Sequence, residues 1–379
     1  MAKAHRGFAM LRFLHSSDLH LGKAFGGYPE AIRNRLREAR HGAIARLAQA
    51  ARDGGADTVL LAGDTFDAET PAPDTLRHAL RAMAAQTDIR WIMLPGNHDS
   101  LAATELWRRI LSEDLPNLRI LTDDTPFALN DHAMLLPAPC TQRRPGRDLT
   151  AAMSAPTPEG CLRVGLGHGA ITDFSAEDGV PGIIPPDRAR LSGLDYLALG
   201  DWHGRMQVGA ETWYCGSPEA DGFKHDMAAG ALLVTLDGGA RVDVVETGTL
   251  EWRRLVLDLL PGDDPVARLD AELPAAHLRR DLLLRLQATG RLPLADRSRL
   301  EAEAEAIAPD FGWFDHDFGQ LATDTRPNDL DQIDHAGALR QAAETLLAEA
   351  HDPALSLSER EVSGNALSRL HTLALQVQA

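Results

Sequence analysis

The 379-residue chain has little cysteine and no long apolar run. Its three cysteines, Cys140, Cys161 and Cys215, are far apart and form no C-x-x-C pair, which argues against a disulfide framework and a zinc–thiolate site. No apolar stretch reaches the roughly 18 residues of a transmembrane helix. The short run Met10–Leu14 contains Arg12 and predicts a strand, not a signal peptide. We therefore expect a cytoplasmic protein that does not enter a membrane.

Positive charge is also scarce. The chain has 38 Lys and Arg against 55 Asp and Glu, a formal net charge of −17. This imbalance argues against a broadly basic nucleic-acid-binding protein, so metal ions or a small arginine cluster would have to attract a polyanionic substrate locally. Arg143, Arg144 and Arg147 form one such cluster, which could hold DNA phosphates. A solvated surface loop is the interpretation that we favour for it.

The first 200 residues predict an α/β domain. Helical periodicity covers residues 32–53 and 74–86, between strand-like segments. This alternation of strands and helices indicates a largely buried sheet. Five short apolar runs have the length and composition of strands: Leu11–His15, Thr58–Ala62, Trp91–Leu94, Leu162–Leu166 and Tyr196–Leu199.

The chain is longer than one typical domain, and we place a boundary near residue 250. Residues 1–250 are predicted to form the larger α/β domain. Strand and helix patterns alternate again over 251–350, which predicts a smaller α/β domain. Residues 351–379 are predicted to be a C-terminal helical segment, with apolar residues at roughly helical spacing.

Polar residues that can bind metal follow each of the five predicted strands. Because ligands bind beyond the carboxyl ends of strands in an α/β sheet, these turns are expected to meet at one edge. Each turn contains or adjoins residues that donate oxygen or imidazole nitrogen. The seven candidate ligands are Asp18, His20, Asp64, Asn97, His168, Asp201 and His203.

This donor set predicts a pair of divalent metal ions. Carboxylate, amide and imidazole donors suit manganese, iron, zinc or magnesium, and seven ligands are too many for one tetrahedral ion. Asp64 is the predicted bridging carboxylate. Two such ions can hold a phosphoryl group for in-line displacement, so we predict a phosphoesterase. His98 is the candidate catalytic residue, a general acid for the leaving oxygen. Asp67 and Asp99 are predicted to orient the ligands.

Three motifs give the chain a family resemblance. They are His15-Ser16-Ser17-Asp18-Leu19-His20-Leu21-Gly22, Gly63-Asp64-Thr65-Phe66-Asp67 and Gly96-Asn97-His98-Asp99. With them, residues 11–250 resemble the calcineurin-like metallophosphoesterase superfamily and, within it, the DNA-repair nucleases of the SbcD type. The resemblance implies a layered core of sheets flanked by helices, with the smaller C-terminal α/β domain acting as a cap.

The resemblance also implies ligands, a reaction and partners. One metal ion, usually Mn2+, would bind Asp18, His20, Asp64 and His203. The other would bind Asp64, Asn97, His168 and Asp201. The reaction would be exonuclease or endonuclease cleavage of DNA in DNA repair. A coiled-coil ATPase subunit of the SbcC type would be the partner, and the nuclease would form a homodimer.

One residue departs from the family pattern. The branch usually has Gly-His-x-His where this chain has Gly200-Asp201-Trp202-His203. Aspartate is a good ligand for a hard cation but adds negative charge, so the second metal ion could be altered or lost. Two other functions stay open. One is a phosphodiesterase or phosphatase acting on a small nucleotide or phosphoester, and the other is a non-catalytic subunit of an ATPase complex.

Overall fold

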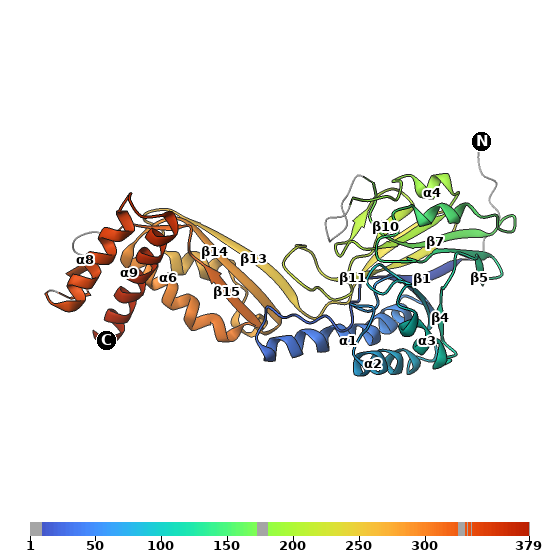
Figure 1. Cartoon of the computed structure of the whole chain (residues 1–379), viewed down its shortest axis with the longest axis horizontal. Helices are drawn as coiled ribbons and strands as arrows, with labels where there is room; N and C mark the ends of the chain where they lie inside the picture. The colour runs from blue at the N-terminus through green and yellow to red at the C-terminus, as the bar shows by residue number, and fades with distance from the viewer. Residues whose placement is uncertain (1–9, 173–180, 325–329, 332, 335, 379) are drawn as a thin grey trace. The chain divides into compact units, whose positions relative to one another are not determined.

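The computed structural model describes residues 10–172, 181–324, 330–331, 333–334 and 336–378. The chain divides into two compact units, Met1–Leu250 and Glu251–Ala379 (Figure 1). Within the described ranges, no helix is both long and apolar enough to span a membrane. Each unit contains its own strands and helices.

The first unit contains two six-stranded sheets. Sheet 1 has the strand order β12-β11-β1-β2-β3-β4 and sheet 2 has the order β5-β6-β7-β8-β10-β9. Strands β1 to β4 run parallel, as do β6, β7, β8 and β10. The strands of sheet 1 are β1 (Leu11–Ser16), β2 (Thr58–Ala62), β3 (Arg90–Leu94), β4 (Leu118–Ile120), β11 (Gly230–Leu236) and β12 (Ala240–Glu246). Those of sheet 2 are β5 (Phe127–Asn130), β6 (Ala133–Ala138), β7 (Leu162–His168), β8 (Tyr196–Gly200), β9 (Met206–Gln207) and β10 (Thr212–Tyr214).

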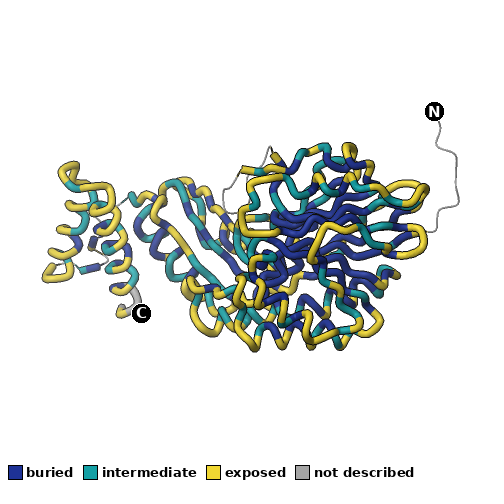
Figure 2. Tube along the Cα trace, turned by 45° about the vertical axis from the view of Figure 1, so that its right-hand side comes forward, coloured by how far each residue is buried: buried dark blue, intermediate teal, exposed yellow. Residues whose placement is uncertain are grey.

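Both faces of each sheet are covered. Because side chains alternate along a strand, Leu60 of β2 packs between the two sheets while Val59 packs against the helices. Phe13 of sheet 1 and Tyr196 of sheet 2 meet edge to face between the sheets, with ring centroids 5.7 Å apart. Figure 2 shows the buried residues gathered along these strands. The helices outside sheet 1 are α1 (Glu30–Asp53), α2 (Pro73–Ala84) and α3 (Thr104–Ser112); η1 (Leu149–Ser154) and α4 (Arg188–Leu191) lie outside sheet 2.

The second unit has a four-stranded sheet with helices on one face. Its long central strand β14 pairs in parallel with β13, β15 and β16. Helix α6 packs on this sheet and against α9, and a second buried cluster includes residues of α6, α8 and α9. The strands are β13 (Glu251–Leu259), β14 (Leu282–Pro293), β15 (Trp313–Asp317) and β16 (Leu321–Asp324). The helices are α5 (Pro265–Glu272), η2 (Ala276–Asp281), α6 (Leu294–Ile307), η3 (Ala308–Asp310), α8 (Ala338–His351) and α9 (Leu357–Gln378).

The structure confirms the predicted α/β class and all five predicted strands that precede the polar turns. The strands were expected to form a layered core, and the structure divides them between two separate sheets: β1, β2 and β3 in one, β7 and β8 in the other. Periodicity alone could not assign this division, because strands of both sheets are equally apolar. The assignment of catalytic, cap and C-terminal roles to 1–250, 251–350 and 351–379 stays a prediction.

A buried arginine ties the turn after β1 to helix α1. Arg40 of α1 is only 2% exposed. Its guanidinium donates hydrogen bonds to the backbone oxygens of Leu19 (2.7 Å), Asp18 (2.9 Å) and Glu219 (3.1 Å). These carbonyls lie outside the strands, where no strand pairing supplies hydrogen-bond donors to them. Arg40 therefore supplies the donors that they would otherwise take from water.

We predict that Arg40→Met destabilises the first unit by about 3 kcal/mol, because buried carbonyls would lose their charged donor. The free energy of unfolding, measured in urea by tryptophan fluorescence, would report this loss. The matched control is Arg81→Met, which removes an exposed arginine on α2. Equal stability of the two variants would contradict the anchoring role of Arg40.

Candidate metal centre

The turns after β1, β2, β3, β7 and β8 converge, and they bring the seven predicted ligands close together. Asp18, His20, Asp64 and Asp201 all have positive φ angles, of 54°, 42°, 52° and 103°. Residues other than glycine seldom adopt this region, and each such residue costs on the order of 1–3 kcal/mol. The sheets and buried contacts that surround the turns therefore hold these side chains in a strained but defined arrangement.

Two glycines of the motifs allow the turns to approach each other. A Cβ atom at Gly63, whose φ is 91°, would lie 2.3 Å from Nδ1 of His168. A Cβ atom at Gly96 would lie 2.1 Å from Oδ1 of Asp64. Both distances are far below van der Waals contact, so a side chain at either position would displace a candidate ligand. The glycines thus have a steric role in the site.

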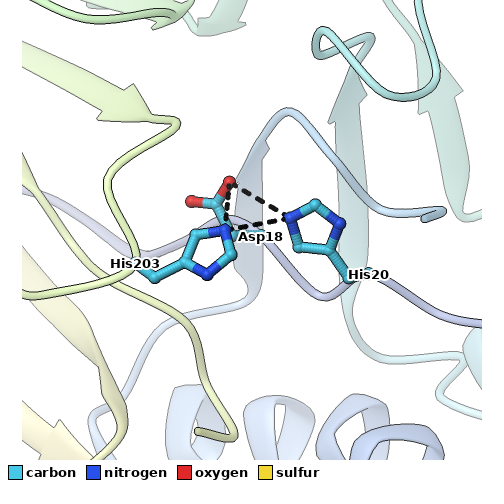
Figure 3. A group of neighbouring side chains, drawn as sticks. All are labelled: Asp18, His20 and His203. Carbon is cyan, nitrogen blue, oxygen red and sulfur yellow. Dashed lines mark hydrogen bonds and ion pairs between the residues drawn. The ribbon is translucent and has the colours of Figure 1, made fainter. Parts of the chain in front are cut away.

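Asp18, His20 and His203 form the first group of donors (Figure 3). Nε2 of His20 lies 3.1 Å from Nε2 of His203 and 3.9 Å from Oδ1 of Asp18. Nε2 of His203 lies 4.0 Å from the same Asp18 oxygen. The three donor atoms therefore face a common point, as Figure 3 shows, and a cation bound there would contact all three.

Asp64 connects this group to a second one. Its Oδ2 lies 3.6 Å from Nε2 of His20 and 3.5 Å from Nε2 of His168. Nε2 of His168 is also 3.8 Å from Oδ1 of Asp201, and that oxygen accepts a hydrogen bond of 3.0 Å from Nδ2 of Asn97. Asp64 therefore lies between the two sets of donors, where the sequence predicted a bridging carboxylate.

Acceptors behind the histidines orient their rings. Nδ1 of His20 lies 3.1 Å from the Asp67 carboxylate, and Nδ1 of His168 lies 2.8 Å from the backbone oxygen of Ala62. A proton on each Nδ1 directs the Nε2 lone pair toward the centre. Asp99 contacts no histidine in this way; it accepts hydrogen bonds from the backbone N–H groups of Gly96 and Phe66 and so holds the turns themselves.

Sequence reasoning missed the residue that orients His203. The Asp221 carboxylate lies 3.3 Å from Nδ1 of His203, pairs with Lys23, and lies 3.9 Å from Arg40. Burial alone would raise the pKa of Asp221, but the hydrogen bond to His203 and the two cations hold it well below its usual range. Asp221 is therefore an anion. The turn-forming Gly216-Ser217-Pro218 segment precedes Asp221 in the sequence but does not by itself indicate a contact with His203.

Carboxylates are crowded in this site. Burial raises the pKa of Asp201 to about 7, and the nearby charges of Asp18 and Asp64 act in the same direction while His168 opposes them. Burial and the charge of Asp64 likewise raise the pKa of Asp99 to about 7. Burial also acts against ionisation of Asp64, but His168, His20 and His98 outweigh it and lower that pKa. Additional positive charge would stabilise the ionised carboxylates.

His98 faces the same space from the turn after β3. Its ring lies 4.8 Å from the His20 ring, centroid to centroid, and its Nδ1 lies 2.9 Å from the backbone oxygen of Asp67. Its backbone N–H donates to Oδ1 of Asp64 at 2.8 Å. Nε2 is thereby directed away from Asp67, which suits the predicted proton donor. His98 also groups with His20 and Asp64 as a possible ligand.

The donor set fits a pair of divalent metal ions. Its members offer oxygen and imidazole nitrogen within three overlapping groups that could each hold an ion. Among the residues that the structure describes, the buried Oδ1 of Asn97 accepts no hydrogen bond, an arrangement that a bound cation would satisfy. Asp201 is in none of these three groups of carboxylates and imidazoles; it joins the second set of donors through its contacts with Asn97 and His168. The ligand role of each residue stays a prediction.

Comparisons with known proteins agree with this chemistry. Residues 11–139 match the family Calcineurin-like phosphoesterase. The chain is similar to the "Uncharacterized metallophosphoesterase YhaO" of Bacillus subtilis strain 168, with 28% identity over 273 residues, 66% of this chain and 63% of that protein. It is also similar to an Escherichia coli K12 protein that is named as a subunit of the nuclease SbcCD, with 34% identity over 105 residues, 27% of this chain and 24% of that protein.

A protein of the same name in Rhodobacter capsulatus is 26% identical over 348 residues, 77% of this chain and 78% of that protein. The matches to the Bacillus and Escherichia relatives span less than two thirds of their lengths. The family match covers β1 to β6, hence the turns that contain Asp18, His20, Asp64 and Asn97. The chain therefore carries a calcineurin-like metallophosphoesterase domain.

Proposed function

We propose that this chain is a dinuclear-metal-dependent phosphodiesterase that cleaves DNA. The observation that carries the proposal is the position of Asp64, whose Oδ2 lies 3.6 Å from His20 and 3.5 Å from His168. A carboxylate between two donor groups can serve two cations, and paired cations suit displacement at phosphorus. A bound pair, for which we propose Mn2+, would supply the positive charge that stabilises the phosphoryl oxygens in the transition state.

The protein residues would then have distinct tasks. Asp18, His20 and His203 would hold one ion, and Asn97, His168 and Asp201 would hold the other, with Asp64 shared. Asp67 and Asp221 would keep His20 and His203 in the orientation that binding requires. His98 would donate a proton from Nε2 to the leaving oxygen, since its Nδ1 is occupied by the Asp67 carbonyl.

DNA is the proposed substrate because two similar proteins are named as parts of a nuclease. In line with those names, we propose a role in DNA repair, either exonuclease or endonuclease cleavage, and assembly with an ATPase subunit of the SbcC type as a homodimer. The alternative is a small nucleotide or phosphoester, which the net charge of −17 favours because it opposes long polyanions. The second alternative, a non-catalytic subunit of an ATPase complex, would be favoured only if the site failed to bind its metal ions.

Manganese-dependent shortening of linear duplex DNA is the expected activity of the purified chain, and a chelator should abolish it. His98→Ala should lower kcat by about 100-fold or more, because general acid catalysis contributes roughly that much. A matched control is His132→Ala, which removes an exposed histidine before β6 and should leave the rate unchanged.

A small nitrophenyl phosphodiester is assayed in parallel. Turnover of this compound without DNA cleavage would move the substrate to a small molecule and leave the metal chemistry intact. Activity on neither substrate would favour the non-catalytic function.

Metal content tests the ligand assignments independently of activity. We expect two Mn2+ per chain by elemental analysis after equilibrium dialysis, and about one in Asp201→Ala, since only the second group loses a donor. Asp64→Ala should bind neither ion tightly, because both groups share that carboxylate. Retention of two ions by Asp201→Ala would show that Asp201 is not a ligand, and His132→Ala again serves as the control.

A further inference from the structure

A cavity with arginines along one side adjoins the second donor group. It has a volume of about 140 Å3 and includes Asn97, His168 and Asp201 among its lining residues. The loop of residues 139–148, between β6 and η1, contributes Arg143, Arg144 and Arg147 to the lining. From the sequence we favour a solvated surface loop for this arginine cluster, but in the structure the cluster borders the candidate metal centre. We call this cavity the arginine pocket.

The remaining wall of the arginine pocket is apolar. Leu149, Ile183 and Ile184 line it, and Ile183 is 39% exposed. Pro145 and Pro181 also contribute. Apolar walls with a few polar groups at one side are typical of sites for small organic groups. A hydrated inorganic anion would gain nothing from this wall, whereas a base or sugar would bury apolar surface against it.

The arginine loop is held at both ends. Cys140 accepts a hydrogen bond from Leu101 N–H at 2.9 Å and donates its own N–H to Pro95 at 3.0 Å, so the loop begins beside the turn that contains Asn97. At the other end, the Asp148 carboxylate pairs with Arg188 and accepts from Thr150 N–H at 2.9 Å. These anchors place the arginines beside the metal centre before any ligand binds, which lowers the entropy cost of binding.

The apolar wall is also held in place beside the site. The N–H groups of Ile183 and Ile184 donate to the Ala170 oxygen at 3.0 and 3.1 Å, two residues beyond the candidate ligand His168. Gly182 lies so close to this segment that a Cβ atom there would approach Ile171 oxygen to 1.8 Å. The apolar wall therefore keeps its position relative to His168.

The arginines on the rim remain available to a ligand. Both Arg143 and Arg147 are exposed, and among the described residues neither has an ion-pair partner. Other arginines, such as Arg52 with Asp88, are already paired with neighbouring carboxylates. A guanidinium presents a planar array of donors that matches two phosphate oxygens.

We propose that the arginine pocket binds the nucleoside next to the cleaved phosphodiester, with the following phosphate paired to Arg143 and Arg147. The proposal rests on the proposed function and adds a substrate-recognition site to it. The volume of the arginine pocket is smaller than the roughly 300 Å3 at which pockets begin to enclose a drug-sized ligand. It suits one base or sugar, so the nucleotide that enters must be unpaired, at a strand end or in a single strand.

The test compares the double variant Arg143→Gln/Arg147→Gln with Arg81→Gln/Arg190→Gln, which removes the same charge from exposed positions on α2 and α4. On single-stranded DNA with Mn2+, the Arg143→Gln/Arg147→Gln variant should raise KM about tenfold and change kcat much less. A tenfold change in KM is the effect expected for the loss of a charged hydrogen bond. Calorimetry with thymidine 5′-monophosphate, in chelator and in Mn2+, should show that the arginine variant binds this nucleotide more weakly by a similar factor.

A second pair of variants tests the apolar wall. Ile183→Asn should weaken binding of thymidine 5′-monophosphate several-fold, and Leu111→Asn, at an exposed leucine on α3, should not. If only the arginine variant affects binding, the pocket recognises phosphate alone and the nucleoside assignment is wrong. Equal KM and equal nucleotide binding in the arginine variant and its control would overturn the proposal.

These outcomes separate the pocket from the proposed function. DNA cleavage that is insensitive to all pocket variants would leave the nuclease proposal intact and refute the pocket. Nucleotide binding that depends on Arg143, Arg147 and Ile183 in a protein without DNA cleavage would support the pocket and place a free nucleotide, not DNA, at the site.

Discussion

Compensation of buried negative charge is the constraint on which the rest of the first unit depends. Asp18, Asp64 and Asp201 are each at most 5% exposed, and their carboxylates share one small region. Ionised carboxylates are costly to bury without opposite charge. Their neighbours within the site are imidazoles, which carry at most one positive charge each, while Arg40 uses its donors on backbone carbonyls. Bound divalent cations would add the positive charge that the imidazoles alone do not supply, and the donor groups fit such ions.

The two sheets make this arrangement possible. The turns that contain Asp18, Asp64 and Asn97 come from sheet 1, and those that contain His168 and Asp201 come from sheet 2. An apolar layer that includes Phe13 and Tyr196 joins the sheets, so neither can shift without disrupting a packed core. Positive φ angles that would otherwise relax are thereby maintained, and the stability of the core supports the strain at the site.

Much of this centre could be predicted from the sequence because strand direction and donor type are both local properties. A run such as Thr58–Ala62 followed by Gly63-Asp64 contains the strand, the turn and the donor within a few residues. Asp221 could not be found this way, since its contact with His203 depends on how a later loop folds back. The role of Arg40 could not be predicted either, because a helical pattern does not indicate which arginine will contact a turn that is distant in the sequence.

The acidic composition does not exclude a polyanionic substrate, because charge acts over short distances in salt. At physiological ionic strength the screening length is about 8 Å, so a phosphate responds to the groups that it contacts and only weakly to the net charge of −17. Many arginines here are paired on the surface, as Arg299 is with Asp264. Arg143 and Arg147 are positioned beside the donors instead. With two divalent cations, this edge would be positive in an otherwise acidic protein, and an anionic ligand would be directed to it.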